Sequence, residues 1–117
     1  MNKRKVGSGK ERIAAEYLKD HGYRILEMNY YCKAGEIDII ALDGDAVIFV
    51  EVKYRTSENC GDPLSAVDRA KQRQITRTAR DYLWRSGYGA ETDCRFDVIG
   101  ITGGRITHIE NAFDAVF

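Results

Sequence analysis

The stretch VIFVEVKYR, residues 47–55, decides the fold. Branched and aromatic side chains dominate it, and neither Gly nor Pro interrupts it, so it is predicted to be a β-strand. Side chains alternate between the two faces of a strand. One face is wholly apolar and carries Ile48, Val50 and Val52. The other face carries two apolar and two charged residues, which are Val47, Phe49, Glu51 and Lys53. Packing alone does not explain the carboxylate and the amine on a strand that is otherwise apolar on both faces.

The preceding segment, EIDIIAL at residues 36–42, also alternates, and the sequence DGD that follows it is typical of a β-hairpin. With a two-residue type II′ loop at Gly44–Asp45, Asp38 is expected to lie opposite Glu51. Directly opposed residues have Cβ atoms ~4.5–5.5 Å apart, and like charges there are destabilising. A loop of three residues would instead set Asp38 against Val50, and a loop of four would set it against Lys53. We favour the two-residue loop, because it keeps each face of the hairpin consistent.

The repulsion between two facing carboxylates on a partly buried surface must be offset by another interaction. One of them could be protonated, cations such as Lys53 could neutralise them, or a divalent metal could bind. Mg²⁺ takes oxygen ligands at ~2.1 Å and often uses one or two carboxylates. Lys53 is expected ~6.6 Å along the strand from Glu51, within reach of a metal-bound water or a phosphate. The cluster favours a metal-phosphate site over the alternative, in which Lys53 pairs with Glu36 and the carboxylates form surface salt bridges.

The remaining elements surround this hairpin. Helical periodicity predicts a helix over residues 9–21, with Ser8 as its N-cap, and a longer one from Asp62–Pro63 to Ser86–Gly87. Further strands are expected at 24–30, 94–101 and 105–110. A strand, a covering helix and a strand imply parallel neighbours. The order α-β-β-β-α-β-β therefore predicts an α/β fold with a mixed central sheet flanked by helices.

Composition sets the remaining bounds. The 117 residues, 44% of them hydrophobic, are expected to form a single domain, 1–117, with residues 1–7 as a basic tail. The longest purely apolar stretch, Ala46–Val50, is too short to span a membrane. No signal peptide is visible, so a cytoplasmic location without a membrane partner is expected. The three cysteines form no CxxC motif, which argues against a zinc site.

Asp38 followed by Glu51-x-Lys53 resembles the D…(D/E)xK signature of the PD-(D/E)xK, or restriction-endonuclease-like, nuclease superfamily. Three longer blocks are more specific: GEIDIIALDGDAVIFVEVKYR, GDPLSAVDRAKQRQI and CRFDVIGI. In this order they resemble the YraN family of small bacterial proteins, which are related to archaeal Holliday-junction resolvases. The resemblance covers residues 7–101 and implies the three-layer restriction-endonuclease-like fold.

The resemblance also implies roles for particular residues. In such nucleases the positions that match Asp38 and Glu51 bind Mg²⁺ or Mn²⁺, helped by the main-chain carbonyl at the position of Val52. The lysine that matches Lys53 orients or activates the attacking water and stabilises charge at phosphorus. These roles are chemically coherent, because a metal and a lysine lower the pKa of the water and neutralise the charge that develops in the transition state.

Four further residues are assigned from the same comparison. Glu11 matches a first-helix glutamate that often completes the metal shell, although Ser8-x-x-Glu11 also fits a capping box with no chemical role. Lys71 matches a family lysine near the scissile phosphate, and Gln72 beside it is assigned to substrate binding as well. Arg55, just past the signature, is expected to contact the phosphate backbone. For Lys71 and Gln72, simple solvation on the helix surface is the alternative.

We therefore expect a metal-dependent endonuclease that hydrolyses phosphodiester bonds in nucleic acid, with Mg²⁺ or Mn²⁺ as its cofactor. The resemblance favours DNA over RNA and suggests branched or junction DNA. One active site per chain implies a homodimer if two strands are to be cut. The alternative is a nucleic-acid-binding or assembly module that keeps the nuclease fold but cleaves little or nothing. Basic residues are concentrated in 1–12 and 64–86, although the formal net charge of the chain is zero.

Overall fold

The computed structural model describes residues 9–55 and 62–117 of the chain. Its elements are α1 (Gly9–Asp20), β1 (Arg24–Cys32), β2 (Gly35–Asp43), β3 (Ala46–Arg55), the 3₁₀ helix η2 (Pro63–Ala66), α2 (Arg69–Arg85), β4 (Cys94–Thr102) and β5 (Arg105–Phe113). This order confirms the α/β fold predicted from the sequence, α-β-β-β-α-β-β. The predicted N-cap Ser8 and the basic tail lie outside the described residues. Within the described residues, no helix is long and apolar enough to cross a membrane.

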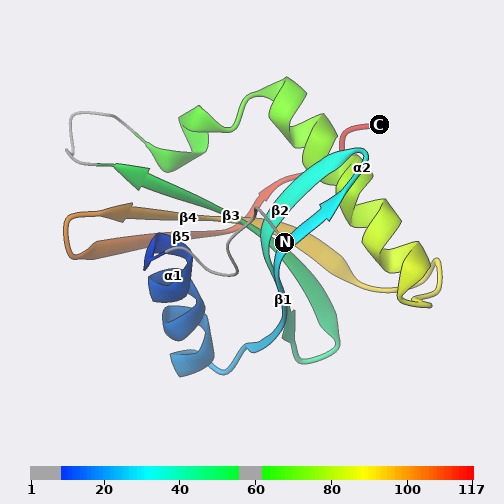
Figure 1. Ribbon diagram of the computed structural model, residues 1–117, viewed down its shortest axis with the longest axis horizontal. Coiled ribbons are helices and arrows are strands. Elements are labelled where there is room, and N and C mark those ends of the chain that lie inside the picture. The colour runs from blue at the N-terminus through cyan, green and yellow to red at the C-terminus, as the bar shows by residue number, and fades with distance from the viewer. Residues whose placement is uncertain (1–8, 56–61) are drawn as a thin grey trace, which may run out of the picture.

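The sheet has the strand order β1-β2-β3-β4-β5. β3 and β4 pair in parallel, as the connection through α2 requires, and the other neighbours pair antiparallel. The two helices lie on opposite sides of the sheet, α1 below its left half and α2 along its right side in Figure 1. This three-layer arrangement of a mixed five-stranded sheet and two helices is compatible with a restriction-endonuclease-like fold.

The alternation of β3 divides the core into two clusters, one under each helix. Ile48 and Val50 pack with Ala14 and Leu18 of α1, and Val52 packs against the same cluster. The opposite face, predicted to carry the charged residues, packs against α2 through Val47, Phe49, Ile75, Ala79 and Tyr82. A central strand buried on both faces needs apolar side chains where helices pack on it. A charged residue on such a strand therefore marks the place where the packed helix no longer covers that face.

The β2–β3 hairpin has the predicted register. Asp43 pairs with Ala46, and the ladder continues in step to Ile39 and Val50. Gly44 has φ +62°, whereas Asp45 does not have a positive φ, as expected for a type II′ loop. A two-residue loop therefore sets which residues of the two strands meet.

Gly44→Ala should lower the free energy of unfolding by about 1–2 kcal/mol, because a side chain disfavours this left-handed backbone conformation. Urea denaturation followed by circular dichroism measures the change. The matched control is Gly104→Ala in the β4–β5 hairpin. A Cβ meets no atom within 4 Å at either position, and Gly104 has no positive φ. Equal losses in the two variants would contradict the role assigned to the φ of Gly44.

The prediction of one long helix from residue 63 to residue 85 is wrong. The chain forms η2, leaves helical geometry at Val67 (φ −112°, ψ 83°) and begins α2 at Arg69. Two aspartates cause this division, because each caps its own helix start. The side chain of Asp62 accepts a hydrogen bond from the amide of Leu64, and that of Asp68 accepts one from the amide of Lys71. α2 is consequently about 25 Å long.

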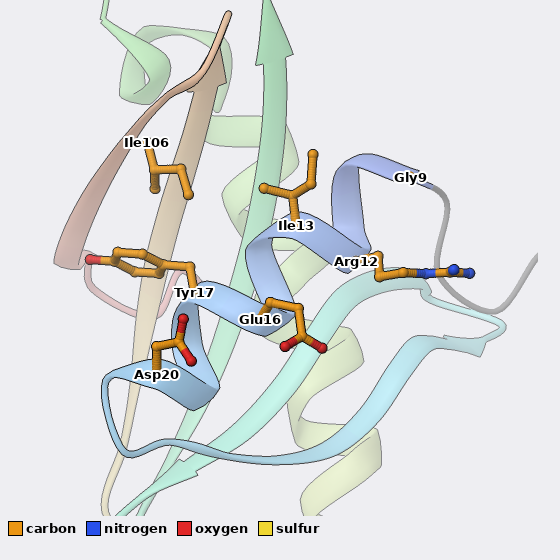
Figure 2. A pocket seen from close by; sticks show the side chains of 7 residues that line it. All are labelled: Gly9, Arg12, Ile13, Glu16, Tyr17, Asp20 and Ile106. Carbon is orange, nitrogen blue, oxygen red and sulfur yellow. The ribbon is translucent and has the colours of Figure 1, made fainter.

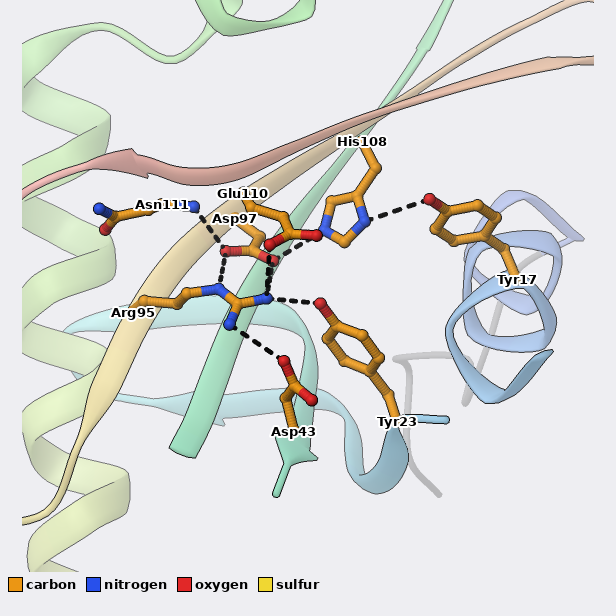
Figure 3. A network of polar contacts seen from close by, with 8 residues as sticks. All are labelled: Tyr17, Tyr23, Asp43, Arg95, Asp97, His108, Glu110 and Asn111. Carbon is orange, nitrogen blue, oxygen red and sulfur yellow. Dashed lines mark hydrogen bonds and ion pairs between the residues drawn. The ribbon is translucent and has the colours of Figure 1, made fainter. Parts of the chain in front are cut away.

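A buried polar network joins β4 to α1, β5 and the β2–β3 hairpin (Figure 3). At its centre Asp97 is fully buried, and its carboxylate accepts hydrogen bonds from Arg95 Nε (2.9 Å), His108 Nε2 (2.7 Å) and the backbone amide of Asn111 (3.0 Å). Burial alone would raise the pKa of Asp97, but these hydrogen bonds hold it below its ordinary value. Asp97 thus holds neighbouring elements of the fold together.

The network extends outward from both sides of Asp97. His108 Nδ1 lies 3.3 Å from the hydroxyl of Tyr17 on α1, and Arg95 also contacts Tyr23, Asp43 and Glu110. β5 was predicted to end at residue 110, but it continues to Phe113 through an irregularity opposite Asp97, where Asn111 has φ +52°. This bulge turns the amide of Asn111 toward the buried carboxylate.

Candidate functional site

The candidate site lies where β2 and β3 separate. Their ladder ends at the pair Ile39–Val50, one residue short of Asp38, and the two strands diverge beyond it (Figure 1). In a continued ladder the amide of Val52 would donate to the carbonyl of Ile37. Here it donates to Asp38 Oδ2 instead, at 2.8 Å. The prediction that Asp38 and Glu51 pair directly across the ladder is therefore wrong. We call the point beyond Ile39 and Val50, where β2 and β3 separate, the fork. Both carboxylates lie there, close enough for the charge of Glu51 to act on Asp38.

Glu51 is held by two lysines from different elements. Its side chain is 7% exposed, and its Oε2 lies 3.2 Å from Lys53 Nζ and 3.7 Å from Lys71 Nζ. Lys53 reaches it along β3, whereas Lys71 reaches it from the first turn of α2, where Asp68 caps the helix. The expected alternative partner of Lys53, Glu36, is thus replaced by Glu51. A nearly buried carboxylate with two cations is a strongly polar site at the edge of an apolar core.

The pKa of Asp38 is strongly shifted by its surroundings in this site. Burial and the charge of Glu51 together raise this pKa to about 8, against the opposing effect of the Val52 amide. Glu11 also raises this pKa, and Lys71 lowers it. The carboxylates of Glu51 on β3 and Glu11 on α1 therefore both raise the pKa of Asp38. Such a raised pKa is the electrostatic sign of a place that would accept an added cation.

Glu11 lies at the start of α1, near enough to act on the charge of Asp38. Its Oε1 accepts a hydrogen bond from Asn29 Nδ2 at 3.0 Å. Asn29 of β1 has φ +54°, and an asparagine tolerates this conformation better than most residues do. The capping alternative for Glu11 depends on Ser8, which lies outside the described residues. Asn29 was missed in the sequence, because nothing in its neighbours indicates that it faces α1.

The predicted substrate-binding residues are held by the segment before α2. Lys71 lies at the site, as described above. Arg55 Nη2 donates to the carbonyl of Asp62 at 3.1 Å, and Gln72 Nε2 donates to the carbonyl of Val67 at 2.9 Å. Arg55 therefore holds the residue before η2, and Gln72 holds the connection between η2 and α2. Contact with substrate stays a prediction for each.

Gly100 lets this connection approach the sheet. It pairs with Lys53 across the parallel ladder, and a Cβ there would lie 2.2 Å from Cγ of Pro63. Only a residue without a side chain admits η2 so close to β4. The sequence signal for this contact is the glycine within the apolar strand CRFDVIGI, which is typical of a close approach by another backbone segment.

The donor set fits a hard divalent cation bound by few protein ligands. Within residues 9–55 and 62–117, no three His, Cys, Asp or Glu side chains lie close enough to form a metal-binding group. Mg²⁺ is commonly bound through one or two carboxylates and several waters, so two carboxylates suffice. Asp38 and Glu51, with the carbonyl of Val52, offer such oxygen donors, and a bound cation would offset the burial and the charge of Glu51 that raise the pKa of Asp38. Glu11, bonded to Asn29, would have to turn in order to join them.

A separate hollow of about 480 Å³ lies between α1 and β5 (Figure 2). It is lined by Gly9, Arg12, Ile13, Glu16, Tyr17, Asp20 and Ile106. Among the described residues, those that line it include none of the predicted site residues. The candidate site is therefore defined by its charged side chains at the fork and is distinct from this hollow.

Known proteins of one family are similar to this chain over nearly its whole length. The family described as "Uncharacterised protein family UPF0102" matches residues 10–101, a span that includes the fork and the whole of α2. A UPF0102 protein of Lachnoclostridium phytofermentans is 49% identical, over 98% of this chain and 98% of the relative. One of Chlorobium chlorochromatii is 50% identical over 92% and 90%, and one of Caldanaerobacter subterraneus subsp. tengcongensis is 47% identical over 97% and 98%.

Proposed function

We propose that this chain, which belongs to the uncharacterised protein family UPF0102, is a metal-dependent endonuclease that hydrolyses phosphodiester bonds in nucleic acid. The family match confirms the resemblance at the level of YraN-like UPF0102 proteins, whereas a relationship to nucleases stays a prediction. One observation carries the proposal: a partly buried Asp38 with a pKa raised to about 8 lies beside the buried Glu51, which Lys53 contacts at 3.2 Å.

The proposed mechanism divides the work between the carboxylates and the lysines. When bound to Asp38 and Glu51, Mg²⁺ or Mn²⁺ would polarise a phosphoryl oxygen and lower the pKa of the attacking water. Lys53, partly exposed beside Glu51, is placed to orient that water and to stabilise negative charge that develops at phosphorus. Lys71 adds a second positive charge from α2 and is placed to hold a neighbouring phosphate. Glu11 would complete the ligand set from α1.

The proposed substrate is DNA rather than RNA, with branched or junction DNA as the leading candidate. Because each chain carries one such site, cutting both strands of a duplex would require a homodimer. A second candidate function is a nucleic-acid-binding module that does not cleave. The observation that favours it is the lack of a three-carboxylate metal group among the described residues.

The test incubates the purified protein with linear, flap and four-way-junction DNA, with Mg²⁺ or Mn²⁺ and with a chelator. We expect metal-dependent cleavage that the chelator abolishes. Asp38→Asn and Lys53→Ala should each lower the rate by at least about 100-fold, the loss typical of removing one group that stabilises the transition state. An RNA strand of matched sequence decides between DNA and RNA.

Glu16→Gln is the matched control for these variants. It also neutralises a carboxylate, but Glu16 is an exposed residue of α1 that pairs with Lys19. This variant should cleave like the wild type. Binding of every substrate without cleavage of any of them would reject the enzyme and favour the binding module.

A further inference from the structure

The outer face of α2 carries a line of cations that the candidate site does not use. Four arginines follow the helix at intervals of four, four and three residues: Arg69, Arg73, Arg77 and Arg80. At 3.6 residues per turn they fall, together with Trp84, within an arc of about 80°. We call these four residues the arginine stripe. Ile75 and Tyr82, which pack on the sheet, lie on the opposite side of the helix, so the stripe faces away from it.

No carboxylate among the described residues pairs with the arginine stripe. Arg69, Arg73 and Arg77 make no ion pair or hydrogen bond with any residue that the structure describes. The acidic residue of α2, Asp81, is taken by Arg85 (3.0 Å) and by the hydroxyl of Tyr30. In a chain of zero formal net charge, this segregation leaves one surface strongly positive.

Exposed aromatic side chains stand at the end of the stripe. Trp84 is 82% exposed and Phe117 is 77% exposed, and the guanidinium of Arg80 lies 5.1 Å from the centre of the Phe117 ring. Trp84 and Phe117 also line a hollow of about 400 Å³, whose wall includes Leu83 and Tyr88. Large aromatic groups are seldom left in water without a partner. An aromatic hollow beside guanidinium groups that no described carboxylate pairs with suits a ligand that is both flat and anionic.

We propose that the outer face of α2 binds single-stranded nucleic acid, with phosphates on the arginine stripe and an unpaired base stacked on Trp84. A groove that combines backbone-tracking cations with a stacking aromatic is the usual solution for single strands. The arginines span about 16 Å along one line, which suits a linear polyanion. An acidic peptide would match the charge but leave the aromatic hollow unfilled, and a lipid surface would need apolar groups along the stripe as well.

This surface deepens the proposed function, since it names an unpaired strand as the partner, but it does not depend on cleavage. Lys71 contacts Glu51 from another side of the helix, so the stripe and the candidate site are separate surfaces on α2. A strand held by the stripe would lead toward the first turn of the helix, where the candidate site begins.

The test uses Trp84 itself, because it is the one tryptophan in the chain. Unlabelled oligo-dT is added to the full chain in chelator and low salt, and tryptophan fluorescence is recorded. We expect quenching as the base stacks on the indole. Anisotropy of labelled oligo-dT then gives the affinity, which Trp84→Ala should lower about tenfold without affecting a blunt duplex of equal length.

The triple variant Arg69→Gln, Arg73→Gln, Arg77→Gln should weaken oligo-dT binding at least tenfold and make the salt dependence shallower by about 2 in slope. The matched control is Arg85→Gln. It removes an arginine from the same helix, but one that lies off the stripe and is paired with Asp81, so binding should change less than about twofold. Circular dichroism of each variant checks that the fold is kept.

Three results would overturn this proposal. They are no quenching by oligo-dT, equal losses in Arg85→Gln and the triple variant, and quenching by anionic lipid vesicles but not by oligo-dT. The outcome is distinguishable from that of the cleavage test. Asp38→Asn should still show quenching, so absent cleavage with intact quenching rejects only the enzyme, and cleavage without quenching rejects only the stripe.

Discussion

Asp38→Asn is expected to make the protein more stable at pH ~8 and to remove most of the pH dependence of its stability. The pKa of Asp38 is raised from 3.8 to about 8 in the fold. Between these values the folded protein holds a proton that the unfolded chain has lost, so the free energy of unfolding falls as the pH rises through this window. Below pH ~4 the contribution is fully present, and above pH ~8 it is lost.

The size of this effect follows from the shift, since each pKa unit corresponds to about 1.4 kcal/mol. The wild type should lose up to about 5 kcal/mol between pH ~4 and pH ~8, and Asp38→Asn, which mimics the protonated form, should lose far less. Urea denaturation at a series of pH values measures it. Glu16→Gln is the control and should follow the wild type. A slope that persists unchanged in Asp38→Asn would show that another group titrates.

The same variant tests the cation without any need for activity. At pH ~8, Mn²⁺ at a hundred times its Kd should stabilise the wild type by about 2.7 kcal/mol, because it binds only the folded site. It should not stabilise Asp38→Asn. A calorimetric titration in which the wild type takes up no Mn²⁺ or Mg²⁺ would remove the metal from the proposed function, and the arginine stripe would stand unaffected.

Asp97→Ala is expected to destabilise the fold by about 3–5 kcal/mol, the usual cost of removing one partner of a buried ion pair. Arg95 would lose its buried carboxylate, and the amide of Asn111 would be left without its acceptor. The loss should be present above the ordinary pKa of 3.8 and should fade as the pH falls through the lower folded value. Urea denaturation at neutral pH gives the difference.

Asp43→Ala is the matched control for Asp97→Ala. It removes another carboxylate from the same guanidinium, at 3.2 Å, but one that is 45% exposed. It should cost less than about 1 kcal/mol. Asp97→Asn, which keeps the shape, should fall between the two. Similar losses in Asp43→Ala and Asp97→Ala would contradict the view that burial makes the network stabilising.

The local pattern of the sequence was enough to predict the element order, the two-residue hairpin loop and the two faces of β3. These features depend on side-chain alternation and on the conformations that Gly and Asp allow, which neighbouring residues determine. The grouping of Asp38, Glu51 and Lys53 followed from the same register. Lys71 was assigned to substrate binding from the resemblance, but its contact with Glu51 was not foreseen.

Other features depend on contacts between segments far apart in the chain. Asn29 of β1 donates a hydrogen bond to Glu11 of α1, and Gly100 is required because Pro63 packs on it. The replacement of a ladder hydrogen bond by the Asp38 carboxylate separates β2 from β3, which no single strand encodes. The sequence by itself therefore determined which residues share a face. Only the tertiary structure decided which carboxylate is buried, because burial and the pKa that it raises depend on what packs above the face.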